Sequence, residues 1–173
     1  MSKVFSGVGF VGCELVPLLL DNGDQLVVVS RKNAQGLDQY RSSGRISFLK
    51  SDPANPANWQ KGSLLNALAE VDGVVNLVGE PIAEQRWTPN HLREIEQSRL
   101  DTTKALVKAM GQLKKPPRVL VNASAIGYYG SSAESRFSED SACGEGFLAR
   151  LCRQWEMLAE EKPPSTRLFV VRI

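Results

Sequence analysis

The sequence predicts an α/β fold built on a doubly wound parallel sheet, and three observations support this prediction. Short apolar runs alternate along the chain with segments whose apolar residues recur at helical spacing. Runs such as Leu-Val-Val-Val at 26–29 are typical of strands buried on both faces. A glycine-rich segment at 7–12 separates the first apolar run from the first helical segment. Such alternation predicts parallel strands joined by helices that cover both faces of the sheet.

The elements follow one another in a regular order, which predicts a single domain over residues 1–173. Strands are expected at 4–5, 26–29, 46–49, 74–77, 119–121 and 168–171. Helices are expected at 10–20, 63–69, 90–113 and 147–161. The third helix has the clearest start, because Thr88 is a good N-cap and Pro89 suits the first helical position. A long loop is expected at 127–144.

The composition is that of an ordinary globular domain, with 42% hydrophobic and 23% charged residues. The net charge of +2 gives no electrostatic reason to expect nucleic acid or a membrane surface as a partner. No apolar run approaches the roughly 20 residues of a transmembrane helix. Cys13, Cys143 and Cys152 lack C-x-x-C spacing, which predicts free thiols in a reducing compartment, the cytoplasm or, in a eukaryote, the plastid stroma.

The single histidine, His91, argues against a zinc site and against a Ser-His-Asp hydrolase. It lies in a helical stretch rich in charge. We therefore expect a solvated surface side chain, and we predict no metal site.

The glycine-rich segment is a G-x-G-x-x-G placed between a strand and a helix. Its glycines would let the backbone approach a pyrophosphate, and the helix N-terminus would supply free N–H groups and a positive dipole. The motif alone is weak, because glycines also serve ordinary tight turns. We assign cofactor binding to Gly7, Gly9, Phe10 and Val11, in an NAD(P)-binding Rossmann fold.

The second predicted strand ends at Ser30, Arg31 and Lys32, about 20 residues beyond the glycine loop. An NAD site usually places an acidic residue there for the ribose 2′-hydroxyl, whereas an NADP site offers arginine for the extra phosphate. Two cations without an acid favour NADP(H) over NAD(H). The alternative is that Arg31 and Lys32 merely solvate a loop.

Six segments together carry a resemblance to a known family. They are GFVG at 9–12, VVSRK at 28–32, VVNLVGEPI at 74–82, RWT at 86–88, NASAIGYYG at 122–130 and CRQWE at 152–156. In this order they resemble an atypical extended short-chain dehydrogenase/reductase of the NAD(P)-dependent epimerase/dehydratase-like family. The narrower likeness is to its epimerase-like, cell-division-inhibitor-like subgroup, and segment 79–87 looks most like cyanobacterial members.

The resemblance implies further cofactor contacts. The family fingerprint T-G-x-x-G-x-x-G falls on residues 5–12, where Ser6 replaces a glycine and is expected to weaken the pyrophosphate site. Asp52 falls where the family places an acid near the adenine, although a turn cap before Pro53 explains it equally well. The N-x-x-G segment that lines the cofactor falls on Asn76, Leu77, Val78 and Gly79.

The resemblance breaks at the catalytic residues. Ser124 matches the family's serine, but Leu148 and Cys152 fall on the tyrosine and lysine of Y-x-x-x-K. Leu148 cannot move a proton, and the two residues fit an apolar helix face. Tyr128 or Tyr129 would then supply the phenol from another direction. Alternatively, Tyr129 belongs to a structural Tyr-Gly turn.

Three functions remain open from the sequence. The chain is an NADP(H)-dependent oxidoreductase or epimerase-like enzyme with an unknown carbonyl or sugar-like substrate, a cofactor-binding regulator or assembly factor without turnover, or a structural subunit with an empty site. Glu80 and Arg86 are either substrate-side polar groups or part of a solvated lid.

The resemblance also implies a second domain. Family members carry a smaller substrate-binding domain after the Rossmann part, so the C-terminal substrate domain is apparently missing here and the chain is expected to be truncated. We expect an open substrate cleft and exposed apolar surface, with a homo-oligomer as one consequence.

Overall fold

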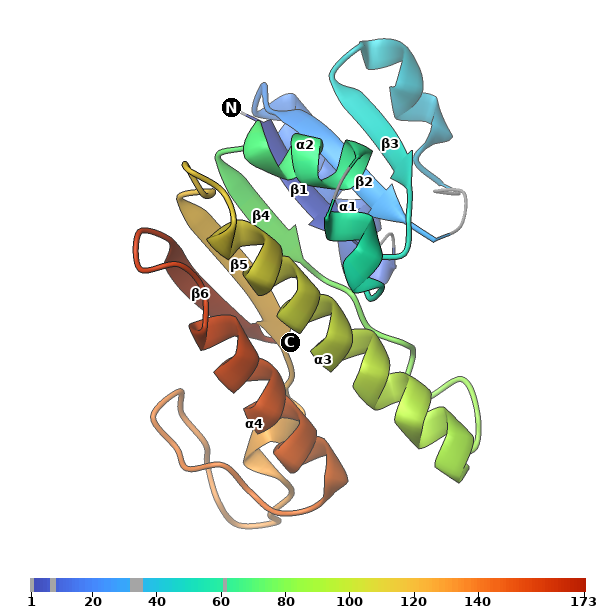
Figure 1. Cartoon of the computed structure of the whole chain (residues 1–173). Helices are drawn as coiled ribbons and strands as arrows, with labels where there is room; N and C mark the ends of the chain where they lie inside the picture. Colours follow the sequence, from blue (N-terminus) through green and yellow to red (C-terminus); the bar gives the residue numbers. More distant parts are fainter. Residues whose placement is uncertain (1, 7–8, 32–35, 61) are drawn as a thin grey trace.

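The computed structural model describes residues 2–6, 9–31, 36–60 and 62–173 and contains one six-stranded sheet with helices on both faces (Figure 1). All strands pair in parallel, in the order β3-β2-β1-β4-β5-β6. The strands are β1 Ser2–Ser6, β2 Gln25–Ser30, β3 Ile46–Lys50, β4 Gly73–Asn76, β5 Val119–Ser124 and β6 Arg167–Arg172. The α-helices are α1 Phe10–Asp21, α2 Ser63–Ala69, α3 Pro89–Gly111 and α4 Phe147–Glu160. The predicted doubly wound parallel sheet is confirmed.

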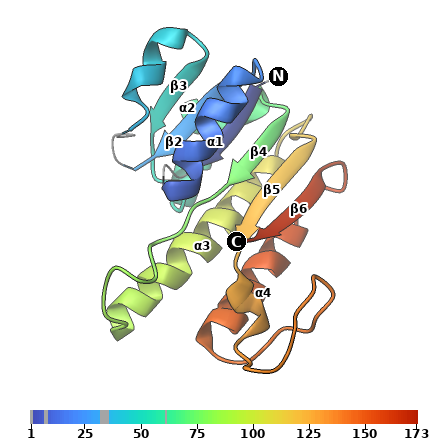
Figure 2. The same ribbon diagram turned by 180° about the vertical axis from the view of Figure 1, so that it is seen from behind.

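The two faces of the sheet are covered unequally. Helices α2, α3 and α4 lie on one face, and α1 lies on the other (Figures 1 and 2). Val28 of β2 packs in the cluster that contains Val16 of α1, whereas its neighbour Val29 packs in the cluster that contains Leu106 of α3. Consecutive β-branched residues therefore point into different helical layers, which explains the unbroken apolar run of this strand.

Several boundaries differ from those predicted. β4 ends at Asn76, one residue earlier than expected, and β1 and β5 are longer. Three short 3₁₀ helices that were not predicted lie at Asp38–Ser43, Pro56–Trp59 and Ile126–Tyr129. The second begins where Asn55 Oδ1 accepts a hydrogen bond from the backbone N–H of Ala57 at 3.0 Å, so loop chemistry creates the turn.

The edge strand β6 is exposed on the face that carries α1 (Figure 2). Phe169 and Val171 are 41% and 42% exposed, and Ile173 just beyond the strand is 53% exposed. This edge strand therefore exposes apolar side chains, while a link to an absent domain and self-association through them stay predictions. Within the described ranges, no helix is both long and apolar enough to cross a membrane.

Candidate cofactor and active site

A cavity of about 500 Å³ opens at the carboxyl ends of β4 and β5. The start of α1 bounds one side of it, and the inner face of α4 bounds another. In doubly wound sheets, ligands bind at this edge because the loops and helix N-termini converge there. The cavity therefore lies where a dinucleotide would be held.

Six of the predicted cofactor residues line this cavity. They are Gly9, Phe10, Val11, Leu77, Val78 and Gly79. Gly9 is the N-cap residue of α1, so the first free N–H groups of that helix adjoin the cavity. Gly7 and Lys32 lie outside the described residues, and Ser30 is the last residue of β2.

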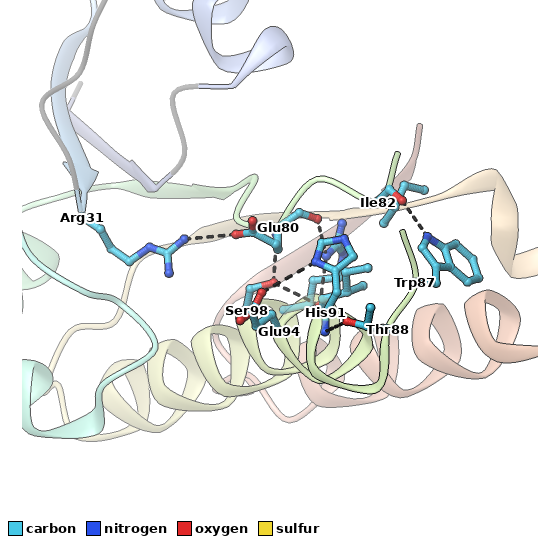
Figure 3. A network of polar contacts seen from close by, with 10 residues as sticks. Arg31, Glu80, Ile82, Trp87, Thr88, His91, Glu94 and Ser98 are labelled. Atoms are coloured by element: carbon cyan, nitrogen blue, oxygen red, sulfur yellow. Dashed lines mark hydrogen bonds and ion pairs between the residues drawn. The ribbon is translucent and has the colours of Figure 1, made fainter. Parts of the chain in front are cut away.

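Arg31 follows β2, with a side chain that is 57% exposed. Its Nη2 lies 3.4 Å from Oε2 of Glu80, in the segment after β4 (Figure 3). Asp52 accepts a hydrogen bond from the backbone N–H of Ala54 at 3.1 Å through Oδ1. Asp52 therefore has the contact of a turn cap, the alternative left open by the sequence.

Asn76, at the end of β4, does not line the cavity but belongs to a buried polar network. Its Nδ2 donates to Thr103 Oγ1 at 2.9 Å and to Asn122 Oδ1 at 2.7 Å. Trp155 Nε1 donates to the same threonine oxygen at 2.8 Å. The network joins β4, β5, α3 and α4 and thereby fixes the carboxyl ends of the two strands that form the cavity floor.

Ser124 lines the cavity at the end of β5. Its hydroxyl donates to Glu156 Oε1 at 2.5 Å. The same oxygen accepts from Arg172 Nε at 2.9 Å, and Oε2 accepts from Arg172 Nη2 at 2.8 Å. The serine proton is directed to the carboxylate, and the same hydroxyl also contacts the Cys152 thiol by a side-chain hydrogen bond.

Tyr128 and Tyr129 both contact Arg172. The Tyr129 hydroxyl accepts a hydrogen bond from Arg172 Nη1 at 2.8 Å, and the Arg172 Cζ lies 3.6 Å from the centroid of the Tyr128 ring. Tyr129 also stacks on Phe137, with ring centroids 5.4 Å apart. Neither tyrosine is among the residues that line the cavity.

The expectation of a solvated His91 is wrong. His91 is 3% exposed, and its ring nitrogens make no hydrogen bond within the described part of the chain, although Nδ1 lies 3.7 Å from Glu94 Oε2. It stands four residues before the fully buried Ile95, so both face inward from α3. The predicted cap is present, because Thr88 Oγ1 accepts from the His91 backbone N–H at 3.2 Å (Figure 3).

Comparison with known proteins establishes the family. A model of the NAD dependent epimerase/dehydratase family matches residues 5–148. The chain belongs to this family. It is 31% identical over 173 residues to the chloroplastic epimerase family protein SDR39U1 homolog of Arabidopsis thaliana, and 33% identical over 175 residues to the human epimerase family protein SDR39U1. These matches take in 99% and 98% of the chain but 47% and 52% of the relatives, so the chain spans about half their length.

Solved structures of the epimerase/dehydratase type agree with the fold. The structure of human SDR39U1 with NADPH matches 99% of the chain and 53% of that protein, at 31% identity and a TM-score of 0.79. The UDP-glucuronic acid 4-epimerase of Bacillus cereus in complex with NAD matches 99% of the chain and 55% of that protein, at 18% identity and a TM-score of 0.81. The second likeness concerns the fold alone.

In this epimerase-family chain, Leu148 and Cys152 both line the cavity from α4. Burial raises the pKa of the Cys152 thiol above its ordinary value, so the group stays neutral. A cation of α3, Arg99, interacts electrostatically with Cys152. Burial lowers the pKa of the Arg99 guanidinium from its ordinary value, and electrostatic interactions with Cys152 and Glu80 oppose that shift.

Arg99, Glu156 and Arg172 were missed as site residues in the sequence. Arg99 Nη1 donates to the carbonyls of Glu80 and Ile95 at 3.0 Å each. Its guanidinium also covers Gly79, where an added Cβ would lie 2.7 Å from Arg99 Cζ. The segment CRQWE contained one signal, because Glu156 follows Cys152 by one helical turn. Nothing local in the sequence indicated the other two.

Proposed function

We propose that this chain is the NADP(H)-binding part of an epimerase-like or oxidoreductase-like protein that acts on a carbonyl or sugar-like substrate. Arg31 carries the preference for NADP(H), because its exposed guanidinium follows β2 where an NAD site would place an acid. The NADPH in the structure of the human relative supports this proposal.

Different residues of the cavity would bind different parts of the cofactor and the substrate. The N-terminus of α1 at Gly9 would hold the pyrophosphate, and the segment Leu77 to Gly79 would pack against the nucleotide. The bound cofactor would supply hydride donation or acceptance. Ser124 would accept a hydrogen bond from a substrate hydroxyl, since its own proton points to Glu156. We retain Tyr128 and Tyr129 as proposed proton donors, which would first have to leave Arg172.

The experiment is a fluorescence titration of the chain with NADPH and with NADH. Arg31→Ala should weaken NADPH binding about 10-fold or more and change NADH binding little, because charge-assisted hydrogen bonds to phosphate are lost. Arg118→Ala is the matched control, since Arg118 precedes β5 and therefore lies at the amino-terminal ends of the strands, opposite the ends that carry the cavity. Equal losses for both nucleotides would refute the phosphate role, and no saturable binding of either would refute the whole proposal.

A second function is favoured by one observation: Leu148, which cannot move a proton, faces the cavity at the tyrosine position implied by the resemblance. The chain would then bind the cofactor and act as a regulator or assembly factor without turnover. Hydride transfer from NADPH to carbonyl compounds separates the two functions. If Tyr128→Phe and Tyr129→Phe both leave such transfer intact, neither phenol is the donor.

A further inference from the structure

Arg31 and Glu80 form an ion pair at 3.4 Å between the segments that follow two different strands (Figure 3). Arg31 directly follows β2, and Glu80 lies in the segment after β4. β1 pairs with both strands and lies between them. Adjacent strands are about 4.8 Å apart, so the two side chains bridge roughly 10 Å of backbone separation. The ion pair therefore lies at the carboxyl ends of the strands, the same end of the sheet as the cavity.

Glu80 is the residue of this ion pair whose backbone is fixed by hydrogen bonds. Its backbone N–H donates to Ser98 Oγ at 2.9 Å, and its carbonyl accepts from Arg99 Nη1 at 3.0 Å. Ser98 in turn donates to the carbonyl of Ile95 at 3.0 Å, so the segment is tied to α3. The Glu80 side chain is 26% exposed, whereas that of Arg31 is 57% exposed. Arg31 is thus the side chain that is free to change partner.

We propose that Glu80 sets how strongly the chain prefers NADPH over NADH, by competing with the 2′-phosphate of NADPH for Arg31. This inference rests on the proposed cofactor binding. A phosphate offers more negative charge and more acceptor oxygens to the guanidinium fork than a carboxylate does. Arg31 exchanges Glu80 for the phosphate when NADPH binds, and the lost ion pair subtracts from the affinity. NADH has no such phosphate, so its affinity does not depend on this exchange.

The test is a titration of the Glu80→Gln variant with NADPH and NADH at low salt. NADPH affinity should rise about two- to five-fold, the range of an exposed ion pair, while NADH affinity stays unchanged. Glu84→Gln, an exposed position in the same segment, is the matched control and should alter neither affinity. Added salt should shrink the difference, because exposed charges are screened. Thermal unfolding of each variant verifies that it is folded.

A double-mutant cycle isolates the competition. In an Arg31→Ala background, Glu80→Gln should no longer change NADPH affinity, since the contested cation is absent. The inference is overturned by an unchanged NADPH affinity in the single variant, by equal gains for both nucleotides, or by a gain that persists without Arg31. If the unmodified chain binds neither nucleotide, the proposed function fails together with it, whereas the other outcomes overturn only the role of Glu80.

Discussion

The Ser124 hydroxyl donates a 2.5 Å hydrogen bond to the Glu156 carboxylate, across a sequence separation of 32 residues. Arg172 completes this unit with two hydrogen bonds to the same carboxylate. The carboxylate thus ties the end of β5 to α4 and to the edge strand β6. The ion pair between Glu156 and Arg172 therefore helps to position Ser124, α4 and β6 relative to one another.

Arg172→Met should lower the free energy of unfolding by about 3 kcal/mol, because it leaves a poorly hydrated carboxylate without its cation. The Glu156 side chain is only 14% exposed. Hydrogen bonds to Glu156 raise the pKa of Arg172 above an already high ordinary value, so the pair loses nothing by deprotonation of Arg172 near neutral pH. Urea unfolding followed by circular dichroism measures the effect.

Arg118→Met is the control for this substitution. Arg118 pairs with Asp72 at 3.2 Å, but the two side chains are 76% and 42% exposed. Solvent-exposed pairs contribute little, so the control should lose less than about 1 kcal/mol. If both variants lost a similar free energy of unfolding, the burial of Glu156 would not explain the effect of Arg172→Met, and the prediction would be wrong.

The adjacent residues Thr102 and Thr103 should respond oppositely to valine. Thr103 Oγ1 accepts from Asn76 and Trp155, so Thr103→Val removes the acceptor of the Trp155 indole N–H and leaves Asn76 Nδ2 with Asn122 alone; it should cost about 2–3 kcal/mol. Thr102 Oγ1 is buried and makes no hydrogen bond to any residue that the structure describes, so Thr102→Val should be neutral or stabilising. Thermal and urea unfolding of both variants decide the matter. A comparable loss at Thr102 would contradict the assignment of the network to Thr103.

Cys152 should make the fold less stable in alkali. Burial raises the pKa of this thiol, so the unfolded chain ionises first as the pH rises above about 8.5. Below that pH both states hold the proton, and the contribution is fully present. Above it the unfolded state binds fewer protons, so the free energy of unfolding falls by at most about 1.4 kcal/mol per pH unit, until the folded thiol also ionises.

Urea unfolding between pH 7.5 and pH 10 measures this slope. Cys152→Ala should flatten it, whatever the substitution does to stability at neutral pH. Cys143→Ala, at a half-buried position outside the cavity, should keep the slope of the unmodified chain. An unchanged slope in Cys152→Ala would mean that other groups cause the alkaline loss.

The sequence predicted the sheet well because its signals are local. The β-branched run of β2 and the Thr88–Pro89 start of α3 depend on neighbouring residues, and both appear as expected. The 3₁₀ helix at Ile126–Tyr129 was missed, although Tyr-Gly turn chemistry had been recognised there. Its C-cap, Gly130, has φ of 73°, a value that local sequence did not specify.

The side chains of the site were harder to predict because long-range contacts orient them. Tyr129 is held by Arg172, and Ser124 by Glu156, across different elements of the fold. His91 was misplaced because the charged residues around it suggested solvent, whereas its spacing to Ile95 places it on the inner face of α3. Helical spacing was the better guide at that position.

The position of β1 at the centre of the sheet has a consequence for the order of folding. Lys3 pairs with Leu26 on one side but with Gly73 on the other, 70 residues later in the chain. At a synthesis rate of about 5–20 residues per second, that second edge stays without its partner for several seconds after β1 is made. A newborn chain therefore passes through a stage in which one edge of β1 is unpaired, and the speed of translation sets how long that stage lasts.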